Sequence, residues 1–124
     1  GYTNFEMGPI LFSQDQRHTA VLVEGDTLTV FYTQAGDCPE QILCATIDLS
    51  ADWLDWQTSE PVSVLLPEMD YEGADLPLEP SERGAIHNRA HQLRDPAIFQ
   101  EDGRTYLLYS VAGENGIAIA ELSL

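Results

Sequence analysis

The feature that most constrains this chain is an internal repeat of a strand–turn–strand–turn–strand unit. Identical residues recur 77 positions apart, at Ala20 and Ala97, Glu24 and Glu101, Tyr32 and Tyr109, Ala35 and Ala112, and Gly36 and Gly113. After a four-residue insertion near position 39 the shift becomes 73, and the DLS at 48–50 then falls on the ELS at 121–123. Two copies of one short unit predict two similar sheets that stack on each other.

Short β-rich runs carry the repeat and its flanks, at 19–24, 27–33, 41–50, 59–66, 96–100, 104–112 and 116–124. Clusters of Gly, Asp and Asn lie between them and predict tight turns. No stretch of a dozen residues has the apolar spacing of an amphipathic helix. The pattern therefore predicts an all-β chain.

The predicted strands are apolar on both faces, which is typical of sheets covered on both sides, whereas strands of a β-sandwich alternate. We expect two four-stranded antiparallel propeller blades plus an extra N-terminal strand, in a partial or oligomer-completed β-propeller. Within one domain, 1–124, this gives an orphan outer strand (1–14, with its apolar part FEMGPILF at 5–12), a first blade (17–66), a long acidic loop (67–92) and a second blade (93–124).

The charge is strongly one-sided, with five arginines against 21 Asp and Glu and a formal net charge of -16. Such a surface repels nucleic acids and anionic membranes and leaves neutral ligands, cations and basic partners open. No apolar run is long enough to cross a bilayer. No signal peptide is visible, so we expect a cytoplasmic protein with Cys38 and Cys44 reduced, although a disulfide between them is the alternative.

The repeat aligns Arg17-His18 with Arg94-Asp95, both at the start of the first strand of a unit. In a propeller this strand is innermost and lines the central channel. We expect Arg94 to keep Asp95 ionised and His18 to exchange protons near neutral pH. A structural interpretation stays open for each: a strand-start motif for Asp95 and a hydrogen-bonded role for His18.

The long acidic loop supplies further candidates. Glu79 is placed to reach back over the channel mouth, and His87 is taken as a ligand-binding candidate. On a helix His87 and His91 would face together as metal ligands, but solvated loop histidines are the simpler interpretation, and neither a metal nor a cofactor is expected. A solvated face is expected for the acidic residues of the loop, Glu68, Asp70, Glu72, Asp75, Glu79 and Glu82.

The segment LRDPAIFQEDGRTYLLYS, at 93–110, resembles the blade-start signature of the five-bladed β-propeller glycosidases, the arabinanase, xylosidase and fructosidase groups and related uncharacterised bacterial propeller proteins. The resemblance covers both units and makes the chain similar to a two-blade, C-terminal-like fragment. It implies that Asp95 stabilises an oxocarbenium-like transition state with Arg94 as its partner. The family's base or nucleophile and general acid have no matching motif here, and His18 stands where the repeat would give an acid.

Three hypotheses follow. The first is carbohydrate binding, with a neutral oligosaccharide held in a channel by Arg17, His18, Arg94, Asp95, Glu79 and His87. The second is a non-catalytic structural module that forms homo-oligomers, or belongs to a larger propeller, through exposed blade faces. The third is a glycoside hydrolase that is active only as a full or assembled propeller. Whether the chain is an enzyme is left open by its sequence.

Overall fold

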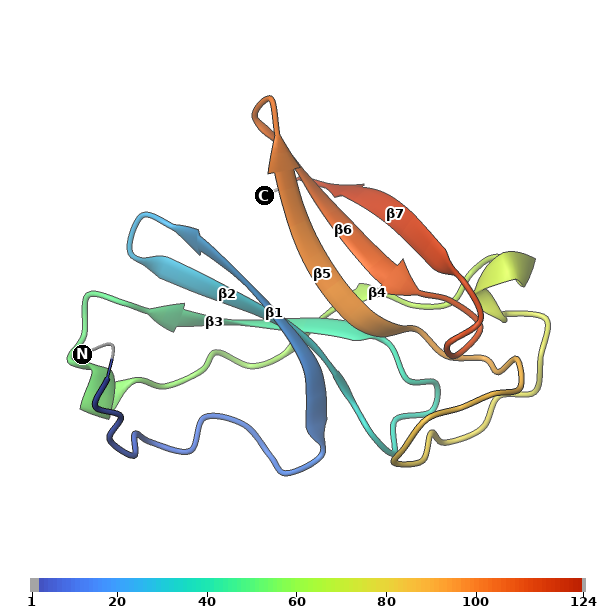
Figure 1. Cartoon of the computed structure of the whole chain (residues 1–124), viewed down its shortest axis with the longest axis horizontal. Coiled ribbons are helices and arrows are strands. Elements are labelled where there is room, and N and C mark those ends of the chain that lie inside the picture. Colours follow the sequence, from blue (N-terminus) through green and yellow to red (C-terminus); the bar gives the residue numbers. More distant parts are fainter. Residues whose placement is uncertain (1–2, 124) are drawn as a thin grey trace.

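Seven β-strands form two antiparallel sheets in the computed structural model, which describes residues 3–123 (Figure 1). The first sheet has the order β1-β2-β3-β4, with β1 at Gln16–Glu24, β2 at Thr27–Gln34, β3 at Ile42–Asp48 and β4 at Val62–Leu65. The second has the order β5-β6-β7, with β5 at Arg94–Glu101, β6 at Arg104–Ser110 and β7 at Ile117–Leu122. Within each sheet every strand pairs with the next one along the chain, and the all-β prediction is confirmed.

Two finer expectations are wrong for the described residues. The second sheet has three strands rather than four, because no strand follows β7 up to Ser123. The extra N-terminal strand is absent from 3–14, although Gly1 and Tyr2 lie outside the described residues. Leu11 and Phe12 instead pack on the first sheet, and the Leu11 carbonyl accepts a bond from the Thr58 hydroxyl at 3.4 Å. The segment therefore covers the sheet without joining its hydrogen-bond ladder.

The repeat seen in the sequence extends to backbone irregularities. The pairing of β1 with β2 shifts register between Arg17 and Ala20, and that of β5 with β6 shifts between Arg94 and Ala97. Such a shift marks a β-bulge, which redirects the side chains at that point of a strand. The bulges therefore change the direction of the side chains at equivalent positions close to the starts of β1 and β5.

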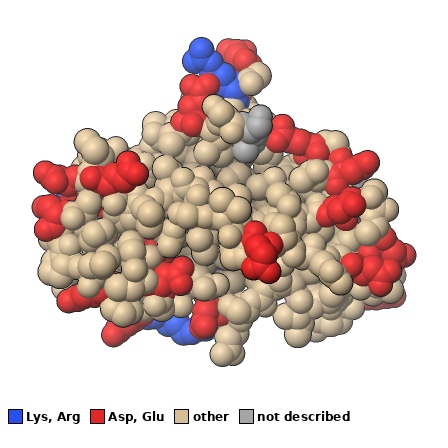
Figure 2. All heavy atoms as spheres, turned by 180° about the vertical axis from the view of Figure 1, so that it is seen from behind, with Lys and Arg blue, Asp and Glu red and all other residues tan. Residues whose placement is uncertain are grey.

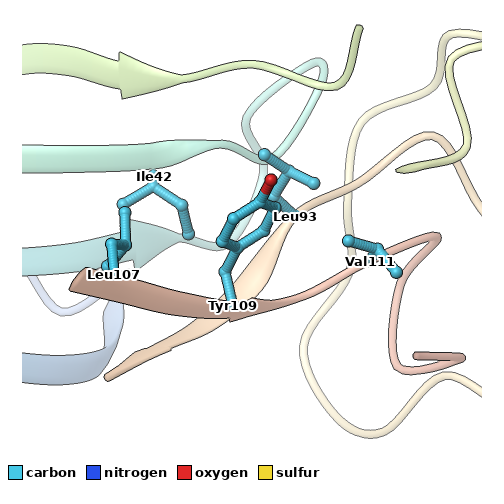
Figure 3. Close-up of a cluster of buried hydrophobic side chains, with 5 residues drawn as sticks. All are labelled: Ile42, Leu93, Leu107, Tyr109 and Val111. Atoms are coloured by element: carbon cyan, nitrogen blue, oxygen red, sulfur yellow. The ribbon is translucent and has the colours of Figure 1, made fainter. Parts of the chain in front are cut away.

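The main core lies between the two sheets. Ile42 from β3 and Leu107 and Tyr109 from β6 meet Leu93 and Val111, which lie just outside the strands (Figure 3). Side chains of β4 and β7 pack against this cluster. A second cluster on the opposite face of the first sheet contains Val30, Tyr32, Ala45 and Ile47 and is covered by Leu11, Phe12 and Trp56.

The opposite face of the second sheet is uncovered. The register places Leu108 opposite Ile119 and Phe99 opposite Tyr106 on this face. Ile119 is 60% exposed and Phe99 is 49% exposed. The prediction that strands are apolar on both faces holds here, but only one of the two faces is packed. We call this surface the open face.

The 67–92 loop contains no strand and one short 3₁₀ helix, Asp70–Glu72. Glu72 is buried, contrary to the expected solvated acidic face: it accepts bonds from the Tyr109 hydroxyl at 2.9 Å and from the backbone N–H groups of Glu68 and Met69. The other five acids of that set are exposed. Among the described residues, no helix is long and apolar enough to cross a membrane.

Candidate functional site

β1 and β5 contact each other, and the residues after their first arginines, His18 and Asp95, lie close together. His18 and Asp95 follow the two arginines and both have left-handed backbones, with φ of 55° and 51°. This conformation is uncommon for residues other than glycine, although Asn, Asp and His adopt it more readily than most. It directs the two side chains toward each other, with Nε2 of His18 3.4 Å from Oδ1 of Asp95.

A buried carboxylate, Glu40, lies behind this pair. Its side chain is fully buried and accepts two bonds from Arg17, Nε to Oε1 at 3.0 Å and Nη2 to Oε2 at 2.6 Å. The Nε of Arg94 is 3.6 Å from Oε2, and Nδ1 of His18 is 4.0 Å from Oε1. Glu40 therefore lies at the centre of the predicted site and contacts residues of both repeat units.

The expected pairing of Arg94 with Asp95 is not observed. Arg94 is buried and donates to the side-chain oxygen of Gln92 at 2.8 and 3.0 Å and to the Gly84 carbonyl at 2.9 Å. Asp95 instead accepts a bond from the Ser110 hydroxyl at 2.8 Å and faces His18. The bulge explains why Arg94 and Asp95 have different partners, because adjacent residues at a bulge point into different environments.

The buried network shifts two ionisation equilibria. Burial alone would raise the pKa of Glu40, but hydrogen bonds from Arg17, Ser81 and Thr33 outweigh it and hold that pKa below its usual value. The hydrogen bond to Glu40 raises the pKa of Arg17. Both pKa shifts favour the charged forms, so Arg17 and Glu40 form an ion pair at neutral pH.

Three side chains of the kinds that bind metal ions lie next to the Arg17–Glu40 network. His18, Asp95 and Glu114 each place one ligand atom within 4.8 Å of the others. Glu114 lies in the turn between β6 and β7 and also contacts Arg94, with Oε1 3.5 Å from Nη1. Imidazole and carboxylate groups in such an arrangement can accept hydrogen bonds, exchange a proton or bind a cation.

The two ligand-binding candidates from the long acidic loop, Glu79 and His87, lie in different surroundings. Glu79 lines a hollow of about 290 Å³ together with Arg94, Gln92 and Arg83. His87 is exposed and does not line that hollow. His87 and His91 are not on a helix, and Nδ1 of His91 lies 3.1 Å from the Leu76 carbonyl.

Sequence reasoning missed two residues of the site. Glu40 lies in the insertion that interrupts the repeat, so the alignment gave it no counterpart. The 77-residue shift also aligns Glu114 with Asp37, and both lie in sequences typical of turns, which gave no reason to expect a site residue. The available signal was chemical: arginines at both strand starts require a carboxylate nearby where they are removed from water, and Glu40 was a candidate for it.

Comparison with known proteins gives one informative match. A protein described as "Uncharacterized protein R118", from Acanthamoeba polyphaga mimivirus, is 45% identical over 107 residues. The match covers 86% of this chain but 30% of that protein, so the chain spans less than a third of its relative's length. No family model and no solved structure matches the chain. The relative is viral, whereas the resemblance in the sequence was to bacterial proteins.

Proposed function

We propose that the chain is a propeller-type segment that binds a neutral, hydroxyl-rich ligand of the oligosaccharide class where β1 and β5 begin. The observation that carries the proposal is the convergence of His18 and Asp95, which two equivalent bulges direct toward each other at 3.4 Å. Two strained residues at matching positions of two repeat units favour a site, because backbone strain persists where the surrounding structure enforces it and is often functional.

The chemistry around this point suits sugar hydroxyls. Asp95 and Glu114 accept hydrogen bonds, and His18 donates or accepts according to its tautomer. The hollow beside Arg94 adds Glu79, Glu82 and Gln92 as further polar groups. On the face shown in Figure 2, acidic side chains are scattered among uncharged ones with few basic ones, and the strongly negative net charge favours neutral over anionic ligands.

Catalysis is a further step, in which the family resemblance assigns transition-state stabilisation to Asp95. A glycosidase needs two carboxyl groups that flank the scissile bond, about 5–5.5 Å apart for retention or farther for inversion. One carboxylate oxygen of Asp95 lies within 4.8 Å of one of Glu114. The family's nucleophile or base and its general acid have no matching motif in this sequence, so binding is the function we propose for this chain alone.

The test is a calorimetric titration of arabino-, xylo- and fructo-oligosaccharides into the wild type, Asp95→Asn and Asp102→Asn. Asp102 is a matched control, because it is an exposed aspartate with φ of 50° at the other end of β5. We expect Asp95→Asn to weaken binding about tenfold, as loss of a hydrogen bond to a charged group does. Absence of binding by the wild type at millimolar sugar, or equal binding by all three proteins, would reject the proposal.

A second candidate function is assembly through the open face. Ile117, Ile119 and Phe99 expose apolar surface on one side of the second sheet, and the sheets of a propeller are covered on both sides. The matched 107 residues make up 30% of the mimivirus relative, which therefore has roughly 360 residues. That length is room for further blades in the relative, and for this chain we propose that the sheet of a second copy covers the open face.

Light scattering after size-exclusion chromatography tests assembly with Ile119→Asp and, as control, Ile10→Asp. Ile10 is 92% exposed but lies in the N-terminal segment, away from the open face. We expect an oligomeric wild type and Ile10→Asp and a monomeric Ile119→Asp. A wild type that stays monomeric at high micromolar concentration excludes assembly by this chain.

A further inference from the structure

We propose that His18, Asp95 and Glu114 form a binding site for a divalent transition-metal ion of the zinc type. They are the described residues whose His, Cys, Asp or Glu ligand atoms gather in a group of three or more. The proposal goes beyond sugar binding and does not rest on it, because the metal alone is the probe in its test.

Each of the three side chains has one polar atom anchored by a neighbour and another directed into the cluster. Nδ1 of His18 is 3.0 Å from the Thr33 hydroxyl, which leaves Nε2 toward Asp95. Oδ2 of Asp95 accepts the bond from Ser110, which leaves Oδ1 toward His18.

Glu114 follows the same pattern. Its Oε2 accepts the backbone N–H of Ile86 at 3.1 Å, which fixes the carboxylate at the edge of the loop. Metal ligands are characteristically held in this way, with an outer partner that sets the orientation and the tautomer. Three anchored side chains from β1, β5 and the β6–β7 turn therefore form a preorganised donor set.

The separation of the donor atoms fits zinc. Zinc binds histidine nitrogen and carboxylate oxygen at about 2.0–2.2 Å in a tetrahedral arrangement, which places neighbouring donors roughly 3.3–3.6 Å apart. Nε2 of His18 and Oδ1 of Asp95 are 3.4 Å apart without any adjustment. The third donor, a carboxylate oxygen of Glu114, lies within 4.8 Å of both.

The charge balance also allows a cation. Glu40, Asp95 and Glu114 carry three negative charges against the two positive charges of Arg17 and Arg94, so the locality is net negative before metal binds. Arg94 is the nearest competing cation: its Nη1 donates to the Gly84 carbonyl at 2.9 Å and, at 3.5 Å, to Oε1 of Glu114, so a metal ion would compete with this longer contact.

The donor set discriminates among metals. One imidazole nitrogen and two carboxylates suit zinc, whereas Ca²⁺ takes six to eight oxygen ligands and Mg²⁺ requires oxygen octahedra. Three protein ligands leave the fourth tetrahedral position open, which is the pattern of zinc sites that bind water or a substrate. The site would thus present a coordinated water beside the proposed ligand-binding edge.

The test is a competition titration of Zn²⁺ against a chromophoric chelator, on chelator-treated protein and without sugar. The variants are His18→Asn, Asp95→Asn and Glu114→Gln, with His87→Asn and Asp102→Asn as controls. Asparagine tolerates the left-handed backbone at 18 and 95, so these variants keep the local fold. Co²⁺ provides a second readout, because its visible absorption reports the coordination geometry.

We expect one Zn²⁺ per chain, at least a tenfold weaker affinity in each ligand variant and wild-type affinity in both controls. Co²⁺ should give the intense visible bands of four-coordination, and Ca²⁺ and Mg²⁺ should not compete. Absence of Zn²⁺ binding, equal loss in the controls, or competition by Ca²⁺ at a similar concentration would each overturn the proposal. Sugar binding without Zn²⁺ binding would reject this site and leave the proposed function intact.

Discussion

Replacement of Glu40 by glutamine tests whether one buried carboxylate holds the two repeat units together. The side chain is fully buried, carries two hydrogen bonds from Arg17 and lies 3.6 Å from Arg94. Glutamine keeps the volume and one accepting oxygen but removes the negative charge. The two guanidinium groups then lose the counter-charge that they share.

The magnitude follows from what each arginine retains. Removal of one partner from a buried ion pair costs about 3–5 kcal/mol, because the remaining charge is left uncompensated. Arg94 keeps its bonds to Gln92 and Gly84, and Arg17 is 16% exposed and keeps its bond to the Glu82 carbonyl. We therefore expect Glu40→Gln to lower the free energy of unfolding by about 3 kcal/mol, the lower end of that range. This loss reduces the folding equilibrium constant more than 100-fold.

The assay is urea denaturation followed by tryptophan fluorescence, with Glu121→Gln as the matched control. Glu121 also pairs with an arginine, Arg104 at 3.7 Å, but the two side chains are 53% and 65% exposed. Exposed pairs contribute about 0–1 kcal/mol. If the two variants lose similar stability, or Glu40→Gln loses less than about 1 kcal/mol, the argument from the buried network is refuted.

Two further outcomes are expected. Gly73 has φ of 93°, and a Cβ there would lie 2.2 Å from the Ala90 carbonyl oxygen, so Gly73→Ala should cost more than about 3 kcal/mol in urea denaturation. Gly25→Ala, with φ of 57° but open space around it, should cost roughly 1 kcal/mol, and equal losses would exclude the steric explanation. Because the folded-state pKa of Glu40 is lowered, its contribution is present above the ordinary glutamate pKa of about 4.3 and is lost as the pH falls through the folded-state pKa. The stability gap between wild type and Glu40→Gln, measured at several pH values, should therefore be constant from pH 7 to about 5 and shrink in stronger acid; a gap that grows on acidification would contradict this sign.

The strands could be predicted from the sequence because strong turn signals separate them. Asp102 and Gly103 both have positive φ, as the tight turn between β5 and β6 requires, and the run that follows begins at Arg104 as observed. The N-terminal segment was predicted as a strand because it is apolar. An apolar run can also cover a sheet without pairing with it, as this segment does. Phe12 packs edge-on against Tyr32 with ring centroids 5.0 Å apart, a contact that needs no strand pairing.

The candidate site was predictable only to the extent that the repeat placed it. The alignment located Arg17 and Arg94 at equivalent positions, and the structure brings both toward Glu40. Their partners depend on contacts across 20 or more residues, such as Arg17 to Glu40 and Arg94 to Glu114. No local pattern encodes such contacts, because they depend on how the sheets pack.

The chemistry of this site arises where the two repeat units differ. The first unit supplies His18 and, in its insertion, the buried Glu40; the second supplies Asp95 and Glu114 from positions that the repeat aligns with His18 and Asp37. A strict repeat would place two like residues face to face at the bulges, either two imidazoles or two mutually repelling carboxylates. The observed pair of imidazole and carboxylate is compatible at close range, and Glu40 is within ion-pair distance of an arginine from each unit. Neither unit alone can therefore form the site, because its residues come together only when the two sheets pack against each other.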